Sequence, residues 1–171
     1  MVDASTNYLS FWLSRQPILV RVVTAMPSEL LSPQERRVWH AFRLMSEDVL
    51  DRIGHDLSEA TGISGPEFGV LSRLAGLGKG EMRQQALAEC LRWDKSRLSH
   101  QLTRMEGRGL IKRHVLDRRV VLVQLTELGR KTLDIAFPVH AESVRRNLLS
   151  RLTAEQIATI VRVSNILGDD D

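Results

Sequence analysis

The hydrophobic periodicity of this 171-residue chain changes over one short stretch, and that change restricts its fold. Along most of the sequence, apolar residues recur every three to four positions, which is typical of amphipathic helices. This helical spacing breaks off in two runs, Ile111–Leu116 and Val120–Leu125, which are rich in β-branched residues and flank the charged tip Asp117-Arg118-Arg119. Such a pattern predicts a β-hairpin. We therefore expect a mainly α fold with one small β-hairpin, an α+β arrangement.

Capping boxes mark the starts of three predicted helices. Ser32, Ser64 and Thr153 each precede a glutamate or glutamine by three positions, so that side chains and backbone can satisfy each other's hydrogen bonds. The first helix should end near Gly62, since its apolar stripe continues to Leu57. A helix this long with more than one apolar face normally packs on two partners, which is a first indication of a dimer.

Further helices are expected on both sides of the hairpin. Met82–Leu91 has the pattern of one helix, and Asp94 is placed to cap the next, which would bury Leu98 and Leu102 on one side. Thr126 should cap a long helix after the hairpin. Two helices joined by a tight turn and followed by a hairpin form a winged helix-turn-helix, here with a helical dimerisation domain.

Basic side chains concentrate in this part of the chain. The whole chain has 24 Lys and Arg against 21 Asp and Glu, a net charge of +3. From Asp94 to Arg119 there are eight basic and three acidic residues, a balance of +5. Clustered cations favour a polyanion partner, because each phosphate contact releases counterions. A solvated charged face is the alternative, but the combination with a helix-turn-helix favours DNA.

The second helix of a helix-turn-helix enters the major groove of DNA with its N-terminal residues toward the base edges. Opposite Leu98 and Leu102, this helix carries short polar or cationic side chains, which suit phosphates and bases. The predicted DNA-binding residues of the helix are Lys95, Ser96, Arg97, Ser99, His100, Thr103 and Arg104.

Several motifs in the same order and at similar spacing resemble the MarR family of bacterial transcriptional regulators, over about residues 33–168. These motifs are Leu87-Ala88-Glu89, Lys95 to Leu102, Gly109-Leu110-Ile111, Asp117-Arg118-Arg119 and Leu125-Thr126-Glu127-Leu128-Gly129. The run SRLSHQ from Ser96, and the later Pro138-Val139-His140 with Val144-Arg145-Arg146, most resemble actinobacterial members. The combination of these motifs is specific for the family, whereas each motif alone is weak evidence for it.

The resemblance implies an obligate homodimer whose interface is formed by the first, fifth and sixth helices. We accordingly divide the chain into a helical dimerisation region, residues 32–63 and 126–168, and a DNA-binding winged lobe, residues 64–125. An N-terminal arm over residues 1–31 is expected to pack on the body, and residues 169–171 form an acidic tail.

The hairpin tip is the second DNA-binding element that the resemblance implies. In the family, an arginine at this turn enters the minor groove and an aspartate holds the charged network of the wing. These positions match Arg119 and Asp117, and Arg118 is expected to share the role. Only three residues separate Arg113 from Asp117, fewer than is usual in the family. We therefore expect a shorter first strand and a reduced reach into the minor groove.

The resemblance also implies an effector, a small aromatic or anionic molecule, in a crevice between the dimerisation helices and the DNA-binding lobe. Trp39, His40, Arg43 and Phe68 are the candidate residues, as aromatic walls and a cationic handle. Packing is the better-supported interpretation of the two aromatic rings, and a surface charge that of the arginine.

The single cysteine, Cys90, excludes an intrachain disulfide and indicates a reducing, cytoplasmic setting. A redox sensor is one interpretation of this cysteine, but we expect a buried, inert thiol. The five histidines have no metal-ligand spacing, and no phosphate-binding glycine loop or nucleophile motif occurs. We therefore expect no metal, no cofactor and no enzymatic activity, and no apolar run long enough to span a membrane.

Together these features predict a dimeric repressor of a pseudo-palindromic DNA operator, with two recognition helices in successive major grooves. Binding of a small molecule would relieve repression. The alternative is a winged-helix protein-interaction module that has lost DNA binding, an interpretation that a short hairpin would favour. An enzyme that uses the helical crevice is disfavoured, because the sequence offers no acid–base pair.

Overall fold

The computed structural model describes residues 30–117 and 120–168. The chain divides into two compact units, Met1–Leu44 and Met45–Asp171. Apart from its last two residues, the predicted N-terminal arm lies outside the described residues, and so does the acidic tail.

Helix α3 (Pro33–Thr61) begins in the first unit and ends in the second. Its predicted capping box is confirmed: the Ser32 amide donates to Glu35 Oε2 at 2.6 Å, and the Glu35 amide donates to Ser32 Oγ at 3.3 Å. In the first unit, the rings of Trp39 and Phe42 stack with their centroids 6.2 Å apart.

The winged lobe follows α3 after a turn at Gly62, whose φ of +69° is a conformation that glycine adopts readily and that ends helices. Ser64 and Glu67 then form the second predicted capping box. The elements of the lobe are α4 (Gly65–Gly76), β1 (Glu81–Arg83), α5 (Gln84–Leu91), α6 (Lys95–Gly107), β2 (Ile111–Asp117) and β3 (Val120–Leu125).

The start of one predicted helix is wrong. The sequence pattern predicts a helix over Met82–Leu91, whereas the structure places the first of these residues in strand β1 and begins α5 at Gln84. The cause is pairing with a distant segment, since Met82 lies opposite Val123 in β3. Local periodicity carries no information about such a partner.

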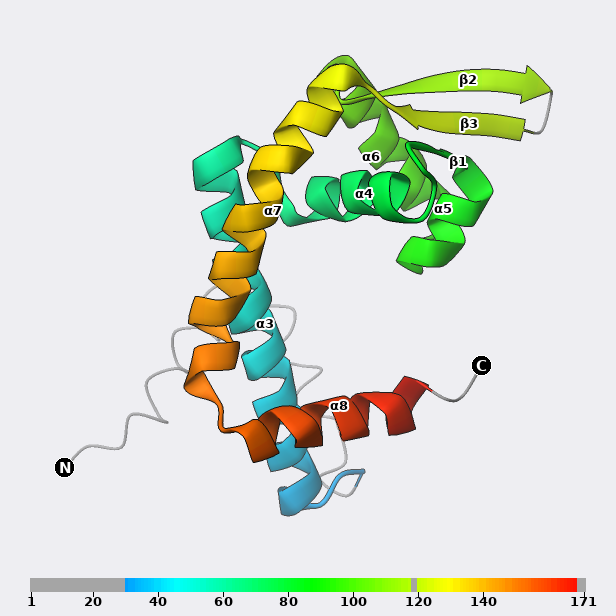
Figure 1. Ribbon diagram of the computed structural model, residues 1–171. Coiled ribbons are helices and arrows are strands. Elements are labelled where there is room, and N and C mark those ends of the chain that lie inside the picture. The colour runs from blue at the N-terminus through cyan, green and yellow to red at the C-terminus, as the bar shows by residue number, and fades with distance from the viewer. Residues whose placement is uncertain (1–29, 118–119, 169–171) are drawn as a thin grey trace, which may run out of the picture. The chain divides into compact units, whose positions relative to one another are not determined.

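The predicted hairpin is confirmed and forms part of a three-stranded antiparallel sheet in the order β1-β3-β2. Strand β3 lies in the centre, and the register of β2 shifts between Val115 and Asp117. Figure 1 shows β2 and β3 extending together away from α4, α5 and α6. The hairpin therefore has the position of the wing in a winged helix-turn-helix.

The core of the second unit lies between these helices and the inner face of the sheet. Leu98, Leu102 and Met105 are fully buried, as the stripe along α6 predicts. They lie in one cluster with apolar residues of the neighbouring elements, among them Leu71, Leu74, Leu87, Ile111 and Val123. This packing determines which face of α6 remains in contact with solvent.

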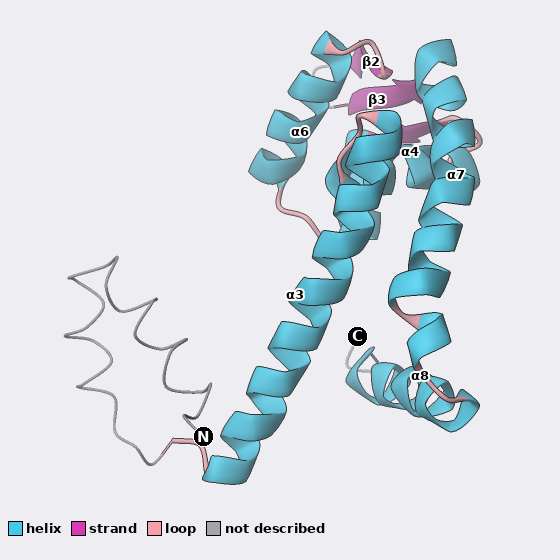
Figure 2. Cartoon of the chain, turned by 90° about the vertical axis from the view of Figure 1, so that its left-hand side faces the viewer, coloured by secondary structure: helices cyan, strands magenta, loops and turns pink. Residues whose placement is uncertain are grey.

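After the hairpin the chain returns to helix. Helix α7 (Glu127–Asn147) is capped by Thr126, runs through Pro138, and leads through a short 3₁₀ turn to α8 (Ala154–Gly168). The C-terminal part of α3 runs beside α7 (Figure 2). Asp56 on α3 accepts a hydrogen bond from Arg146 on α7. No described helix is long and apolar enough to cross a membrane.

Candidate nucleic-acid interface

Helix α6 presents the face that is predicted to contact DNA. Asp94 caps its N-terminus by accepting a hydrogen bond from the Arg97 amide at 2.8 Å. Because Leu98 and Leu102 are fully buried, the opposite face lies toward solvent. Of the seven predicted residues of this helix, Ser99 is half-buried and the other six are exposed: Lys95, Ser96, Arg97, His100, Thr103 and Arg104.

The connection between α5 and α6 is short and is closed by a backbone hydrogen bond. Arg92 adopts a left-handed backbone conformation with a φ of +51°, which is uncommon for a residue other than glycine. The Trp93 amide donates to the Ala88 carbonyl at 3.0 Å. This turn fixes the direction of α6 relative to α5, as a helix-turn-helix requires.

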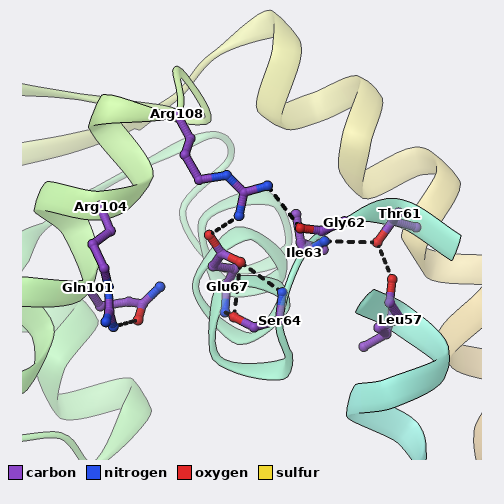
Figure 3. Close-up of polar contacts among 9 residues, drawn as sticks. All are labelled: Leu57, Thr61, Gly62, Ile63, Ser64, Glu67, Gln101, Arg104 and Arg108. Carbon is purple, nitrogen blue, oxygen red and sulfur yellow. Dashed lines mark hydrogen bonds and ion pairs between the residues drawn. The ribbon is translucent and has the colours of Figure 1, made fainter. Parts of the chain in front are cut away.

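Two arginines on the exposed face are held by neighbouring side chains. The Arg97 guanidinium lies over the indole of Trp93, with Cζ 4.4 Å from the ring centroid. Arg104 Nη2 donates to Gln101 Oε1 at 2.5 Å (Figure 3). Each contact restricts a long, flexible side chain, so less conformational entropy remains to be lost on binding.

Arg108, one of the eight cations counted in the sequence, is engaged in an ion pair within the lobe. Its Nη1 lies 2.6 Å from Glu67 Oε1, and its Nη2 donates to the Gly62 carbonyl at 2.9 Å (Figure 3). Glu67 is buried, and its other oxygen accepts from the Ser64 amide at 2.8 Å. Arg108 therefore joins the C-terminal end of α6 to the turn between α3 and α4.

Arg113 is engaged in the same way at the base of the wing. It donates to Glu106 Oε2 from Nε at 2.9 Å and from Nη2 at 2.6 Å, and its amide donates to Oε1 at 2.8 Å. The hydrogen bonds from Arg113 hold the pKa of Glu106 below its usual value. Two of the eight cations are thus paired with carboxylates within the lobe: Glu106 is already subtracted in the sequence balance, whereas Glu67 lies outside the counted stretch.

The wing is described up to Asp117, which is exposed at the end of the seven-residue strand β2. Arg118 and Arg119 lie outside the described residues. Their role in the minor groove, and the reduced reach of the wing, stay predictions.

The four candidate effector residues fall in both units. Trp39, His40 and Arg43 are exposed on α3 in the first unit. Phe68 is buried in the second, where its ring stacks on His140 with centroids 4.5 Å apart. This buried position agrees with the favoured interpretation that Phe68 packs in the core. The grouping of the four residues around an effector stays a prediction.

The prediction of a buried Cys90 is wrong, because this cysteine is exposed. Helix α5 has eight residues and buries Leu87 and Ala88, and Cys90 lies off that face. Sequence reasoning also missed the contact between Trp93 and Arg97, although their spacing of four residues is one that brings side chains together in a helical segment.

A polar cluster between α3 and α7 was also missed. The Ser143 hydroxyl, which is buried, donates to Asp56 Oδ2. Arg146 Nη2 and Asn147 Nδ2 donate to the same oxygen at 2.6 Å and 3.1 Å. The spacing of three and four residues along α7 puts these donors on one face, but the sequence does not indicate which carboxylate they would meet.

Comparisons with known proteins agree with this architecture. The sequence profile of the MarR family matches residues 61–120. The transcriptional regulator HosA of Escherichia coli is 34% identical over 122 residues, which cover 70% of this chain and 86% of HosA. The chain belongs to the MarR family.

Solved structures of MarR-family regulators from Streptomyces coelicolor have the same fold. AbsC is 28% identical, with a TM-score of 0.74 over 83% of this chain and 97% of AbsC. A second regulator, solved in complex with DNA, is 27% identical, with a TM-score of 0.76 over 82% of this chain and 90% of its own. The profile match in this MarR-family protein includes α4, α5, α6 and β2, and thus the candidate interface on α6.

Proposed function

We propose that this MarR-family protein is a sequence-specific DNA-binding transcriptional regulator that works as a homodimer. The observation that carries the proposal is the exposed face of α6, where polar and cationic side chains stand opposite a fully buried apolar stripe. A curated relative that is a transcriptional regulator, and a similar regulator solved with DNA, support this function over a protein-interaction module.

Within this proposal, α6 enters the major groove. Arg97, Ser99, His100 and Arg104 supply contacts to bases or phosphates there. At the wing, Arg119 enters the minor groove with help from Asp117 and Arg118. The helical region, residues 32–63 and 126–168, supplies the dimer interface.

Support for the homodimer comes from α8. None of its residues is buried in the described chain, and its apolar side chains Ile160, Val161, Val163, Ile166 and Leu167 are all exposed. An isolated helix of 15 residues is marginally stable in water, so a second copy of the chain that covers this apolar face would stabilise it.

The direction and trigger of regulation are a further part of this proposal. We infer repression of an operator with two-fold symmetry, relieved by a small aromatic or anionic effector, in the cytoplasm. We also infer that the chain is of the actinobacterial type, as its motifs indicate. The two similar structures, at 27% and 28% identity, are from Streptomyces, although the relative at 34% identity is from Escherichia coli.

Selection of bound fragments from the source genome tests the proposal. The full chain should enrich fragments that share one pseudo-palindromic site, and a gel shift with that site should weaken steeply as salt rises. Failure to shift any fragment at low salt would contradict the proposal.

The contribution of the wing can be measured with the same site. Arg119→Ala should weaken binding to all sequences similarly and lower the dependence of log K on log salt by about one unit per contact. An unchanged salt dependence would exclude a phosphate or minor-groove role for Arg119.

A further inference from the structure

We propose that Trp93 is a positioning residue for base recognition: its indole face holds the Arg97 guanidinium so that Arg97 reads a guanine in the major groove. The inference rests on the proposed DNA-binding function and names a base and a residue pair that determine specificity.

Contacts of both its side chain and its backbone hold Trp93 in place. Its side chain packs against the buried core cluster, and its amide donates to the Ala88 carbonyl at 3.0 Å. The ring is therefore tied to the turn between α5 and α6, and its position follows the position of the helix-turn-helix itself.

Arg97 lies in the first turn of α6, the part of a recognition helix that points toward base edges. Its backbone amide is held by the Asp94 carboxylate at 2.8 Å, and its side chain is exposed. Its Cζ lies 4.4 Å from the centroid of the Trp93 ring. The backbone and the end of this side chain are thus both restrained before any partner arrives.

The contact of the Arg97 guanidinium with the Trp93 ring is compatible with hydrogen bonding by Arg97 to a base. A guanidinium stacks through its face, whereas its five N–H donors lie in its plane. A planar fork of donors fits O6 and N7 of guanine, and this pair discriminates against other bases by about five- to 150-fold. A stacked arginine at an exposed site gains about two- to fivefold from the contact. Trp93 should therefore increase discrimination at one base pair of each half-site.

The test uses the full chain and a duplex selected by the wild-type protein from a random-sequence pool. Each base pair of the site is then replaced in turn, and relative affinities are measured for wild type, Arg97→Lys, Trp93→Leu, Trp93→Phe and the double variant of Arg97→Lys with Trp93→Leu. Arg97→Lys keeps the charge and loses the planar fork, and Trp93→Phe keeps an aromatic face.

We expect Arg97→Lys to lose the preference for guanine at one base pair of each half-site. Trp93→Leu should lose about two- to fivefold of discrimination at that same base pair, and Trp93→Phe should lose less. The double variant should discriminate no worse than Arg97→Lys alone, because Trp93 acts through Arg97.

A purely structural role for Trp93 would lower the affinity for all duplexes equally, and that result overturns the inference. So does a double variant that is additively worse than either single variant. If Trp93→Leu does not fold, as circular dichroism would report, Arg97→Lys decides: an unchanged guanine preference overturns the inference. A wild-type protein that selects no site refutes the proposed function itself, which distinguishes the two failures.

Discussion

Glu67 links three segments of the winged lobe through one carboxylate. It accepts from the Ser64 amide at the start of α4 and pairs with Arg108 at the end of α6, and Arg108 in turn donates to the Gly62 carbonyl (Figure 3). The Glu67 side chain is 7% exposed and that of Arg108 is 46% exposed. The Glu67 carboxylate is thus largely removed from water. Its removal would leave the Arg108 guanidinium and the Ser64 amide without their hydrogen-bond acceptor.

Glu67→Ala should lower the free energy of unfolding by about 2–3 kcal/mol, because it removes the cap of α4 and the partner of Arg108 together. Chemical denaturation measures this loss. Glu81→Ala, which removes an exposed glutamate from β1, is the matched control and should change stability by less than about 0.5 kcal/mol. Equal effects of the two substitutions would show that the Glu67 network contributes little.

Asp56 on α3 accepts hydrogen bonds from three side chains of α7, and these bonds lower its pKa. The hydrogen bond from Ser143 is the largest cause, followed among the favourable contributions by Arg146 and Asn147. A carboxyl with a folded-state pKa below its unfolded value stabilises the fold at pH values above the unfolded pKa. That contribution is lost as the pH falls through the folded pKa.

Wild-type protein should therefore lose thermal stability as the pH falls below about 4. Asp56→Asn should have a lower Tm at pH 7 and a smaller further decrease on acidification. The decrease will not vanish, since the pKa values of Glu106 and Glu35 are lowered as well. Parallel Tm curves for the two proteins between pH 7 and pH 3 would be inconsistent with this role of Asp56.

Among the elements, the junction between the wing and α7 depends on one glycine. A Cβ at Gly129, in the first turn of α7, would lie 2.1 Å from the Leu110 carbonyl oxygen and 2.9 Å from Leu125 Cδ1. The nearest atom belongs to the backbone and cannot rotate away. Close packing against Leu110 and Leu125 thus explains why a glycine stands at the end of the motif at residues 125–129.

Gly129→Ala should destabilise the protein by about 2–3 kcal/mol, because α7 must move away from the start of the hairpin. Gly107→Ala is the matched control in α6, where an added Cβ has no atom within 4 Å. It should stabilise the protein by up to about 1 kcal/mol through helix propensity. Thermal unfolding of both variants checks the difference in sign, and a tolerated Gly129→Ala would contradict the packing argument.

The elements differ in how far the sequence predicts them. Capping boxes and apolar stripes are local, so the helix starts at Ser32 and Ser64 and the buried face of α6 follow from the sequence alone. Strand β1 could not be predicted, because its residues pair with β3 far along the chain. The ion pair of Arg108 with Glu67 has the same cause, since the partners are 41 residues apart.

The sequence predicted which side chains lie on the exposed face of α6, but not which neighbours they contact. The seven side chains on α6 share a face because helical geometry requires it. Which arginines are restrained depends on tertiary neighbours, such as the Trp93 ring beside Arg97. Exposure of Cys90 likewise depends on which face of the short helix α5 the core covers.

In the whole molecule, two recognition helices in successive major grooves require two copies of the chain. Ile160→Glu places a charge on the exposed apolar face of α8 and should disrupt the dimer, because an unpaired charge is costly to bury. Arg162→Glu adds the same side chain on the side of α8 opposite Ile160, since two residues correspond to about 200° around a helix, and should leave the dimer intact.

Sedimentation equilibrium measures the result. Wild type and Arg162→Glu should sediment at twice the chain mass of 19.4 kDa, and Ile160→Glu should approach the mass of one chain. A wild-type protein that is monomeric at every concentration would refute the two-fold arrangement.

Methylation interference on the selected duplex determines whether α6 lies in the major groove, because methylation of guanine N7 alters the floor of that groove. Two α6 helices in successive major grooves predict two clusters of interfering guanines, about 10 base pairs apart and related by two-fold symmetry. Binding that tolerates N7 methylation throughout the site, or a single cluster without a symmetric partner, would exclude two symmetric recognition helices in the major groove.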